Sequence, residues 1–126
     1  MSESQIRSYS VRARSTDTFG RVLLSARDQH LVVDGPVQNG CPGEALGPAE
    51  LFLGGVGACG VELMQVIARE QSFPLDSIHV EIEGRMDRAN PVRRDVSVFN
   101  SVHVRFHLQG VTQAQASDLV ERFRAR

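Results

Sequence analysis

The chain has 126 residues, of which 41% are hydrophobic and 23% are charged. This length suits one domain with a single core that buries roughly two thirds of the surface of the unfolded chain. The formal charge is −1, so no basic excess favours nucleic acid or an anionic membrane. We therefore expect a small molecule or another protein as the partner, and neither nucleic acid nor a membrane.

The N-terminus has neither the basic start nor the apolar run of a signal peptide. No stretch comes near the roughly 18 apolar residues that a membrane span requires. The sequence therefore predicts a cytoplasmic protein. It contains two cysteines, Cys41 and Cys59. Because a core of this size needs no disulfide, both are expected to be free thiols.

The first third of the chain shows a broken β pattern. An alternating segment around Val11 is followed by short apolar runs at residues 19–24 and 31–33. These segments predict two or three antiparallel strands. Residues 35–47 contain four glycines and two prolines, a composition that predicts a loop redirecting the chain.

A long helix is predicted to begin at Pro48, because proline is tolerated in the first helical turn and Glu50 suits its positive dipole end. Residues 51–61 carry no charge, and a helix apolar all round is typical of a buried one. Its glycines each cost about 1 kcal/mol relative to alanine. They are Gly54, Gly55, Gly57 and Gly60. Such glycines favour close approach of a second helix or a symmetry mate. The helix is expected to end before Pro74.

Two alternating segments follow, at residues 78–86 and 96–108, separated by a polar turn at 87–94. They predict an antiparallel hairpin with one packed and one solvated face. His103 and His107 share a face of the second strand, about 13 Å apart. This separation is too large for one shared ion, so no metal site is expected.

A second, amphipathic helix is predicted after Thr112, which forms a capping box with Gln115. Its core-facing residues are Ala116, Leu119, Val120 and Phe123. No terminating signal precedes Arg126, so residues 1–126 are expected to be a single domain that lacks its C-terminal end. The whole pattern predicts an α+β fold with an antiparallel β-meander, a long buried central helix, a β-hairpin and a C-terminal helix.

Cys59 has two interpretations. Free cysteine usually behaves as a small buried hydrophobe. However, Gly55 and Gly60 would open space beside the sulfur, and a thiol that a substrate can reach is chemically useful. Glu62 shares its helix face, as do Phe52 and Val56. A nearby carboxylate disfavours a thiolate, so a reactive Cys59 would need a cation from another segment, with arginine the best candidate.

The run at residues 47–60, Gly-Pro-Ala-Glu-Leu-Phe-Leu-Gly-Gly-Val-Gly-Ala-Cys-Gly, resembles the signature of the OsmC/Ohr family. In that family a proline opens the central helix, acidic residues follow, and a small-residue run ends in Ala-Cys. The segment Val-Asp-Gly-Pro at 33–36 resembles the end of the family's N-terminal meander. The resemblance spans nearly the whole chain. The spacing Pro-x-Glu is more similar to the broad OsmC-like branch than to the well-defined hydroperoxide reductases.

This resemblance implies an intertwined homodimer with two interfacial sites and a thiol-dependent peroxidase activity toward organic hydroperoxides. Cys59 would attack the peroxide and become a sulfenic acid, and an external dithiol would regenerate it. The family's site arginine corresponds best to Arg21, with Arg14 as the alternative, and its glutamate to Glu50. No cofactor and no metal are implied.

Three features differ from the peroxidase pattern. The peroxidases place a glutamate directly after the motif proline, where this chain has Ala49, so Glu50 comes one position late and faces away on a regular helix. The family's second cysteine has no counterpart, although Cys41 could resolve the sulfenic acid if its loop reached Cys59. The site arginine has no certain match. The alternative functions are therefore a dimeric binding module for a small hydrophobic or thiol-bearing ligand and a dimerisation scaffold.

Overall fold

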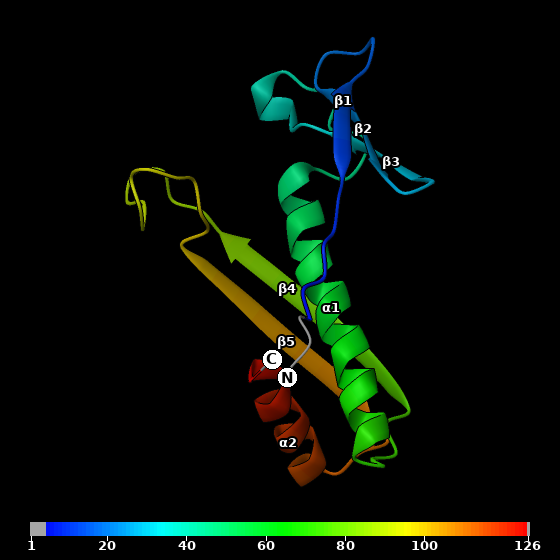
Figure 1. Cartoon of the computed structure of the whole chain (residues 1–126). Coiled ribbons are helices and arrows are strands. Elements are labelled where there is room, and N and C mark those ends of the chain that lie inside the picture. Colours follow the sequence, from blue (N-terminus) through cyan, green and yellow to red (C-terminus); the bar gives the residue numbers. More distant parts are fainter. Residues whose placement is uncertain (1–4, 126) are drawn as a thin grey trace. The chain divides into compact units, whose positions relative to one another are not determined.

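The computed structural model describes residues 5–125, which form two helices, five strands and one 3-10 turn (Figure 1). The fold is α+β with antiparallel sheets, as the sequence predicts. The chain divides into two compact units, Met1–Leu51 and Phe52–Arg126. The division falls near the start of the long helix α1 (Pro48–Glu70).

The first unit is a three-stranded antiparallel sheet in the order β1-β2-β3. The strands are β1 (Arg12–Ser15), β2 (Arg21–Ala26) and β3 (Gln29–Asp34), and a 3-10 turn, η1 (Val37–Asn39), follows them. This sheet confirms the predicted meander. The apolar Val33 is buried at the end of β3, next to the equally buried Asp34.

Cys41 packs in a notch made by two glycines of the first unit. A Cβ atom added to Gly20 or to Gly35 would collide with the Cys41 side chain. Gly20 also has a positive φ of 80°, a conformation that glycine adopts without strain. Cys41 is therefore half-buried and holds the loop after β3 against the sheet.

The second unit packs helices against one face of a hairpin. Strand β4 (Ser77–Arg85) pairs with β5 (Ser101–Gln109), and α2 (Gln113–Arg124) follows. The core consists of residues from the second half of α1 and from α2. They are Met64, Ile67, Ala68 and Leu119. The inward side chains of the hairpin pack around this cluster, and Phe106 of β5 meets Phe123 of α2 edge to face at 5.3 Å.

Helix α2 begins with the predicted capping box. The Thr112 hydroxyl accepts the Gln115 backbone N–H at 3.1 Å, and the Gln115 side chain accepts the Thr112 N–H at 3.0 Å. Leu119 is fully buried, and Val120 packs against the core. The predicted core-facing positions are thus confirmed for Leu119, Val120 and Phe123, whereas Ala116 is half-buried and outside the core cluster. The expectation of a missing C-terminal end remains a prediction, and residue 126 lies outside the described residues.

Strand β5 starts later than its alternation predicts. Pairing begins at Ser101, so Val96 and Val98 lie in the loop between the strands and are exposed. The reason is tertiary. The ring of Phe99 packs over Gly84, where a Cβ atom would lie 2.9 Å from it, and the backbone N–H of Asn100 donates to the Arg85 carbonyl at 2.7 Å. These contacts close the loop only at residues 99–100.

The two halves of α1 differ in burial. Gly60 and Met64 are buried in the second half, whereas Phe52 is 62% exposed and Val56 38% exposed in the first half. The sequence predicts burial for the uncharged residues 51–61, but within the chain most of them are exposed or half-buried, and Gly60 is the buried one. The second half is amphipathic, with Met64 buried and Glu62 and Gln65 exposed.

By length and composition alone, α1 is apolar enough to cross a membrane, with a mean hydropathy of 1.7, contrary to the expectation from the sequence. The core helix of a soluble protein passes the same test. The packing of its second half into the core of the second unit favours that interpretation.

Candidate functional site

Cys59 is an exposed free thiol on α1. A Cβ atom added to Gly55 would meet no heavy atom within 4 Å, so the predicted open space exists there. Gly60 has a different role, because its Cβ atom would lie 3.2 Å from the Phe106 ring. The thiol is thus accessible, and Gly60 serves the packing of the helix on the hairpin.

Apolar side chains are exposed on the part of α1 that carries the thiol. Phe52 and Val56, which precede Cys59 at helical spacing, are both exposed. Phe52 also lies 5.8 Å from Phe99, measured between ring centroids. Glu62, one turn further on, is exposed as well. An exposed thiol within an apolar helix surface can receive an apolar ligand or the surface of another chain.

Arg21 is held by a buried carboxylate in the first unit. Its Nε and Nη2 donate to Asp34 at 2.8 and 2.9 Å, and Nη2 lies 3.6 Å from a carboxylate oxygen of Glu44. Asp34 also accepts the backbone N–H groups of Glu44 at 3.0 Å and Ala45 at 2.9 Å. We call this set the Arg21–Asp34 clip. It joins β2, the end of β3 and the loop that leads to α1.

The clip fixes the charge state of both partners. The hydrogen bond from Arg21 lowers the pKa of the Asp34 carboxyl well below its usual range, and the two backbone donors add to this effect against the cost of burial. The same hydrogen bond raises the pKa of Arg21. A guanidinium has five N–H donors; Asp34 accepts from two of them, and the carboxylate of Glu44 lies next to Nη2. The remaining donors can still bind an anion.

The sequence pattern around Asp34 indicates a paired carboxylate, although Asp34 is not among the predicted site residues. Asp34 lies in the Val-Asp-Gly-Pro segment, where a lone acid after a buried valine at a strand end has to be paired. The alternative cation, Arg14, lies exposed on β1 opposite Leu23.

Glu50 acts at the start of α1. Its Oε1 accepts the backbone N–H of Gly47 at 2.8 Å, and the Gly47 carbonyl accepts the N–H of Leu51 at 2.9 Å. The carboxylate therefore satisfies a backbone donor at the helix N-terminus. Glu50 and Arg21 belong to the first unit and Cys59 to the second, so their grouping into one site stays a prediction.

The strand histidines are exposed, and the structure adds a neighbour that the sequence analysis did not consider. His79 of β4 lies opposite His107, with 5.7 Å between ring centroids, and Glu81 is within 3.5 Å of His79 and 3.7 Å of His107. Within residues 5–125, no group of three His, Cys, Asp or Glu side chains is arranged to hold a metal ion.

The family model described as OsmC-like protein matches residues 41–126, so the chain belongs to the OsmC-like family. No curated protein is significantly similar to the chain. Solved structures share the fold. An OsmC-like protein from Mycoplasma pneumoniae has a TM-score of 0.80 at 13% identity, covering 95% of this chain and 82% of its own.

Two further structures carry functional descriptions. The first is an organic hydroperoxide resistance protein from Legionella pneumophila, also described as a predicted redox protein, with a TM-score of 0.71 and 23% identity over 95% of this chain and 84% of its own. The second is a putative organic hydroperoxide resistance protein from Vibrio cholerae with captopril bound in one of its active sites. Its TM-score is 0.69 at 22% identity, over 96% of this chain and 81% of its own.

Proposed function

We propose that this chain is a thiol-dependent peroxidase that reduces organic hydroperoxides, with Cys59 as the nucleophile. The observation that carries the proposal is an exposed thiol on the central helix of an OsmC-like chain, beside glycines that leave open space and apolar side chains that suit an organic group. The descriptions of the Legionella and Vibrio proteins support the substrate class.

The reaction balances with two substrates. The Cys59 thiolate attacks the terminal peroxide oxygen, an S–O bond forms, and the O–O bond breaks. Sulfur loses two electrons, and the leaving alkoxide takes a proton to become an alcohol. A dithiol then reduces the sulfenic acid to the thiol, releases water and becomes a disulfide.

The Arg21 guanidinium is proposed to stabilise the Cys59 thiolate. The Glu50 carboxylate is proposed to belong to the same site. The clip engages Nε and Nη2 of Arg21, and the Nη1 donors could bind a thiolate or a peroxide oxygen. Glu50 would act from the start of the helix that carries Cys59. We further propose a cytoplasmic homodimer in which a partner covers the exposed first half of α1.

The activity is tested by comparing Cys59→Ser with Cys41→Ser. Cumene hydroperoxide should remove one thiol per chain and form a sulfenic acid in the wild type and in Cys41→Ser. Cys59→Ser should form none, because the remaining thiol is packed in its glycine notch. Sulfenic acid trapping and thiol titration measure both. Equal reactivity of the two variants would contradict Cys59 as the nucleophile.

The role of Arg21 is tested by the pH profile of Cys59 alkylation in the Cys41→Ser background. A cation favours the thiolate, so Arg21→Gln should shift the profile toward higher pH by about one unit. Arg14→Gln, a substitution of an exposed arginine in the same sheet, is the matched control and should leave the profile in place. A shift with Arg14→Gln alone would assign the role to the alternative arginine.

The alternative function is a binding module in which Cys59 only lines an apolar site. The exposure of Phe52 and Val56 favours it, because both could contact a hydrophobic ligand. Absence of sulfenic acid after organic hydroperoxide, together with saturable binding of a small apolar thiol, would replace the peroxidase by this function.

A further inference from the structure

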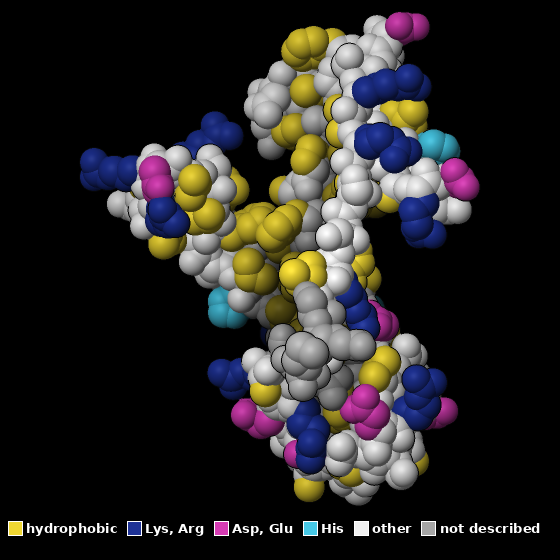
Figure 2. All heavy atoms as spheres, in the orientation of Figure 1, with side chains coloured by type: hydrophobic (Ala, Val, Ile, Leu, Met, Phe, Trp, Pro, Cys, Tyr) yellow, Lys and Arg dark blue, Asp and Glu magenta, His cyan; other side chains and the backbone are white. Residues whose placement is uncertain are grey.

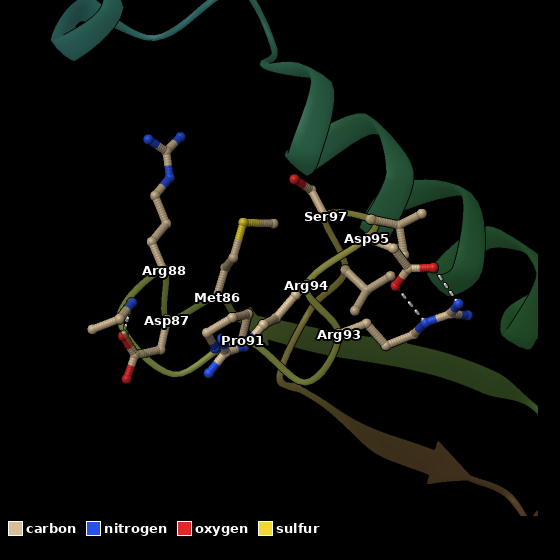
Figure 3. A pocket seen from close by; sticks show the side chains of 11 residues that line it. Met86, Asp87, Arg88, Pro91, Arg93, Arg94, Asp95 and Ser97 are labelled. Atoms are coloured by element: carbon tan, nitrogen blue, oxygen red, sulfur yellow. Dashed lines mark hydrogen bonds and ion pairs between the residues drawn. The ribbon is translucent and has the colours of Figure 1, made fainter.

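The loop between β4 and β5 encloses an open hollow of about 910 Å³, which lies wholly within the second unit (Figure 3). The loop spans residues 86–98 and is separate from the residues proposed for peroxidase chemistry. Its volume falls within the range of pockets that bind small molecules. The side chains that line the hollow determine which class of ligand it would bind.

Asn100 gives this loop a defined shape. Its side-chain oxygen accepts the Asp87 N–H at 2.7 Å, and its side-chain nitrogen donates to the Asn90 carbonyl at 2.7 Å. The Asp87 carboxylate accepts the Ala89 N–H at 2.9 Å and the Asn90 side-chain N–H at 3.1 Å. These bonds lower the pKa of Asp87, with the Asn90 bond the largest cause. One of the two acidic groups of the hollow is thus committed to the turn.

The arginines of the hollow are only partly paired. Arg93 makes a two-point ion pair with Asp95. Arg88 and Arg94 have no ion pair or hydrogen bond with any other described residue. Figure 3 shows Arg88 on one side of the hollow and the Arg93–Asp95 pair on the other. In Figure 2, the lobe at the left shows this loop with its basic side chains next to hydrophobic ones. Two guanidinium groups therefore remain available.

The rest of the lining is apolar and exposed. Met86 is 48% exposed, Val96 47% and Val98 39%, and the loop also presents Pro91. An apolar surface beside unpaired cations suits a ligand that has both an acid group and a hydrocarbon part. An inorganic anion would leave the apolar lining in water, and a neutral hydrocarbon would leave the guanidinium groups without a partner.

We propose that this hollow binds small amphipathic anions. The acid group, a carboxylate or a phosphate monoester, interacts with Arg88 or Arg94, and a short alkyl chain covers Met86, Val96 and Val98. Asn100 is a positioning residue, because it holds the loop in the shape that presents these side chains. The proposal does not depend on the reactivity of Cys59.

The experiment titrates the full chain carrying Cys59→Ser with octanoate, octyl phosphate and octanol, and follows backbone amide shifts by NMR. At least one acid should bind saturably and shift the amides of residues 86–98, and octanol should bind at least fivefold more weakly. The tighter acid identifies the class of head group. Equal binding of octanol, or shifts centred outside the loop, would overturn the proposal.

Substitutions of the charged side chains locate the acid group. At least one of the single variants Arg88→Gln and Arg94→Gln should weaken binding by about fivefold, which is the range of an exposed charge interaction. Arg105→Gln, on exposed β5, is the matched control and should change binding less than twofold. Asp95→Asn should tighten binding by about threefold, because it releases Arg93. Unchanged affinity in the Arg88→Gln and Arg94→Gln double variant would refute the proposed contact. Circular dichroism checks that each variant is folded.

Discussion

The two halves of α1 differ both in sequence and in surroundings: residues 51–59 are uncharged and rich in glycine, whereas residues 60–70 carry polar and charged side chains on one side. The second half buries Met64, Ile67 and Ala68 in the core of the second unit, and Gly60 makes room for the Phe106 ring. The first half exposes Phe52 and leaves Gly55 without any neighbour at its Cβ position. An apolar helix surface with unused space favours a partner. The amphipathic second half therefore serves core packing, and the apolar first half serves the proposed dimer and thiol site.

The largest effect that would test this contrast concerns the packed half. Met64→Ala should lower the free energy of unfolding by about 2–5 kcal/mol, because it removes a fully buried side chain and leaves a cavity. Gln65→Ala, at the exposed neighbouring position, should change it by less than about 0.5 kcal/mol. Urea unfolding at one protein concentration measures both. Similar losses would show that Met64 is not a core anchor.

The second prediction concerns the exposed half. The chain should sediment as a dimer at micromolar concentration, and Phe52→Ser should raise the dimer dissociation constant by about tenfold or more, because buried aromatic anchors dominate interfaces. Val92→Ser is a matched control, since Val92 is 63% exposed and Phe52 is 62% exposed. A monomeric wild type, or an equal effect of both variants, would contradict a partner surface on the first half of α1.

The smallest effect compares two glycines of the same helix. Alanine at Gly55 meets no atom of the chain, so it should stabilise the helix of the isolated chain by up to about 1 kcal/mol. Alanine at Gly60 would press on Phe106, whose ring meets Phe123 edge to face, and should lose most of that gain. Unfolding of both variants in the Phe52→Ser background provides the measurement. Equal stabilisation would remove the distinction between the two halves.

Local patterns predicted much of this fold and the family. The capping box at Thr112 and the start of α1 at Pro48 depend on neighbours within a few residues, so the sequence contains them in full. Alternation marked the two strands of the hairpin, although their pairing joins residues as far apart as Ser77 and Gln109. The Ala-Cys end of the small-residue run indicated the OsmC-like family, which the family model confirms. It also singled out Cys59, whose exposure agrees with a reachable thiol.

The sequence by itself therefore determined which segments form helices and strands, and which cysteine to consider. Only the tertiary structure decided where β5 begins, because Phe99 and Asn100 close the loop through contacts with residues 84 and 85. It alone paired Arg21 with Asp34, thirteen positions away, and set His79 opposite His107. Such contacts depend on the register of paired strands and on the path of the loops that connect them. No local periodicity encodes them, since side chains distant in sequence meet only after the backbone has folded.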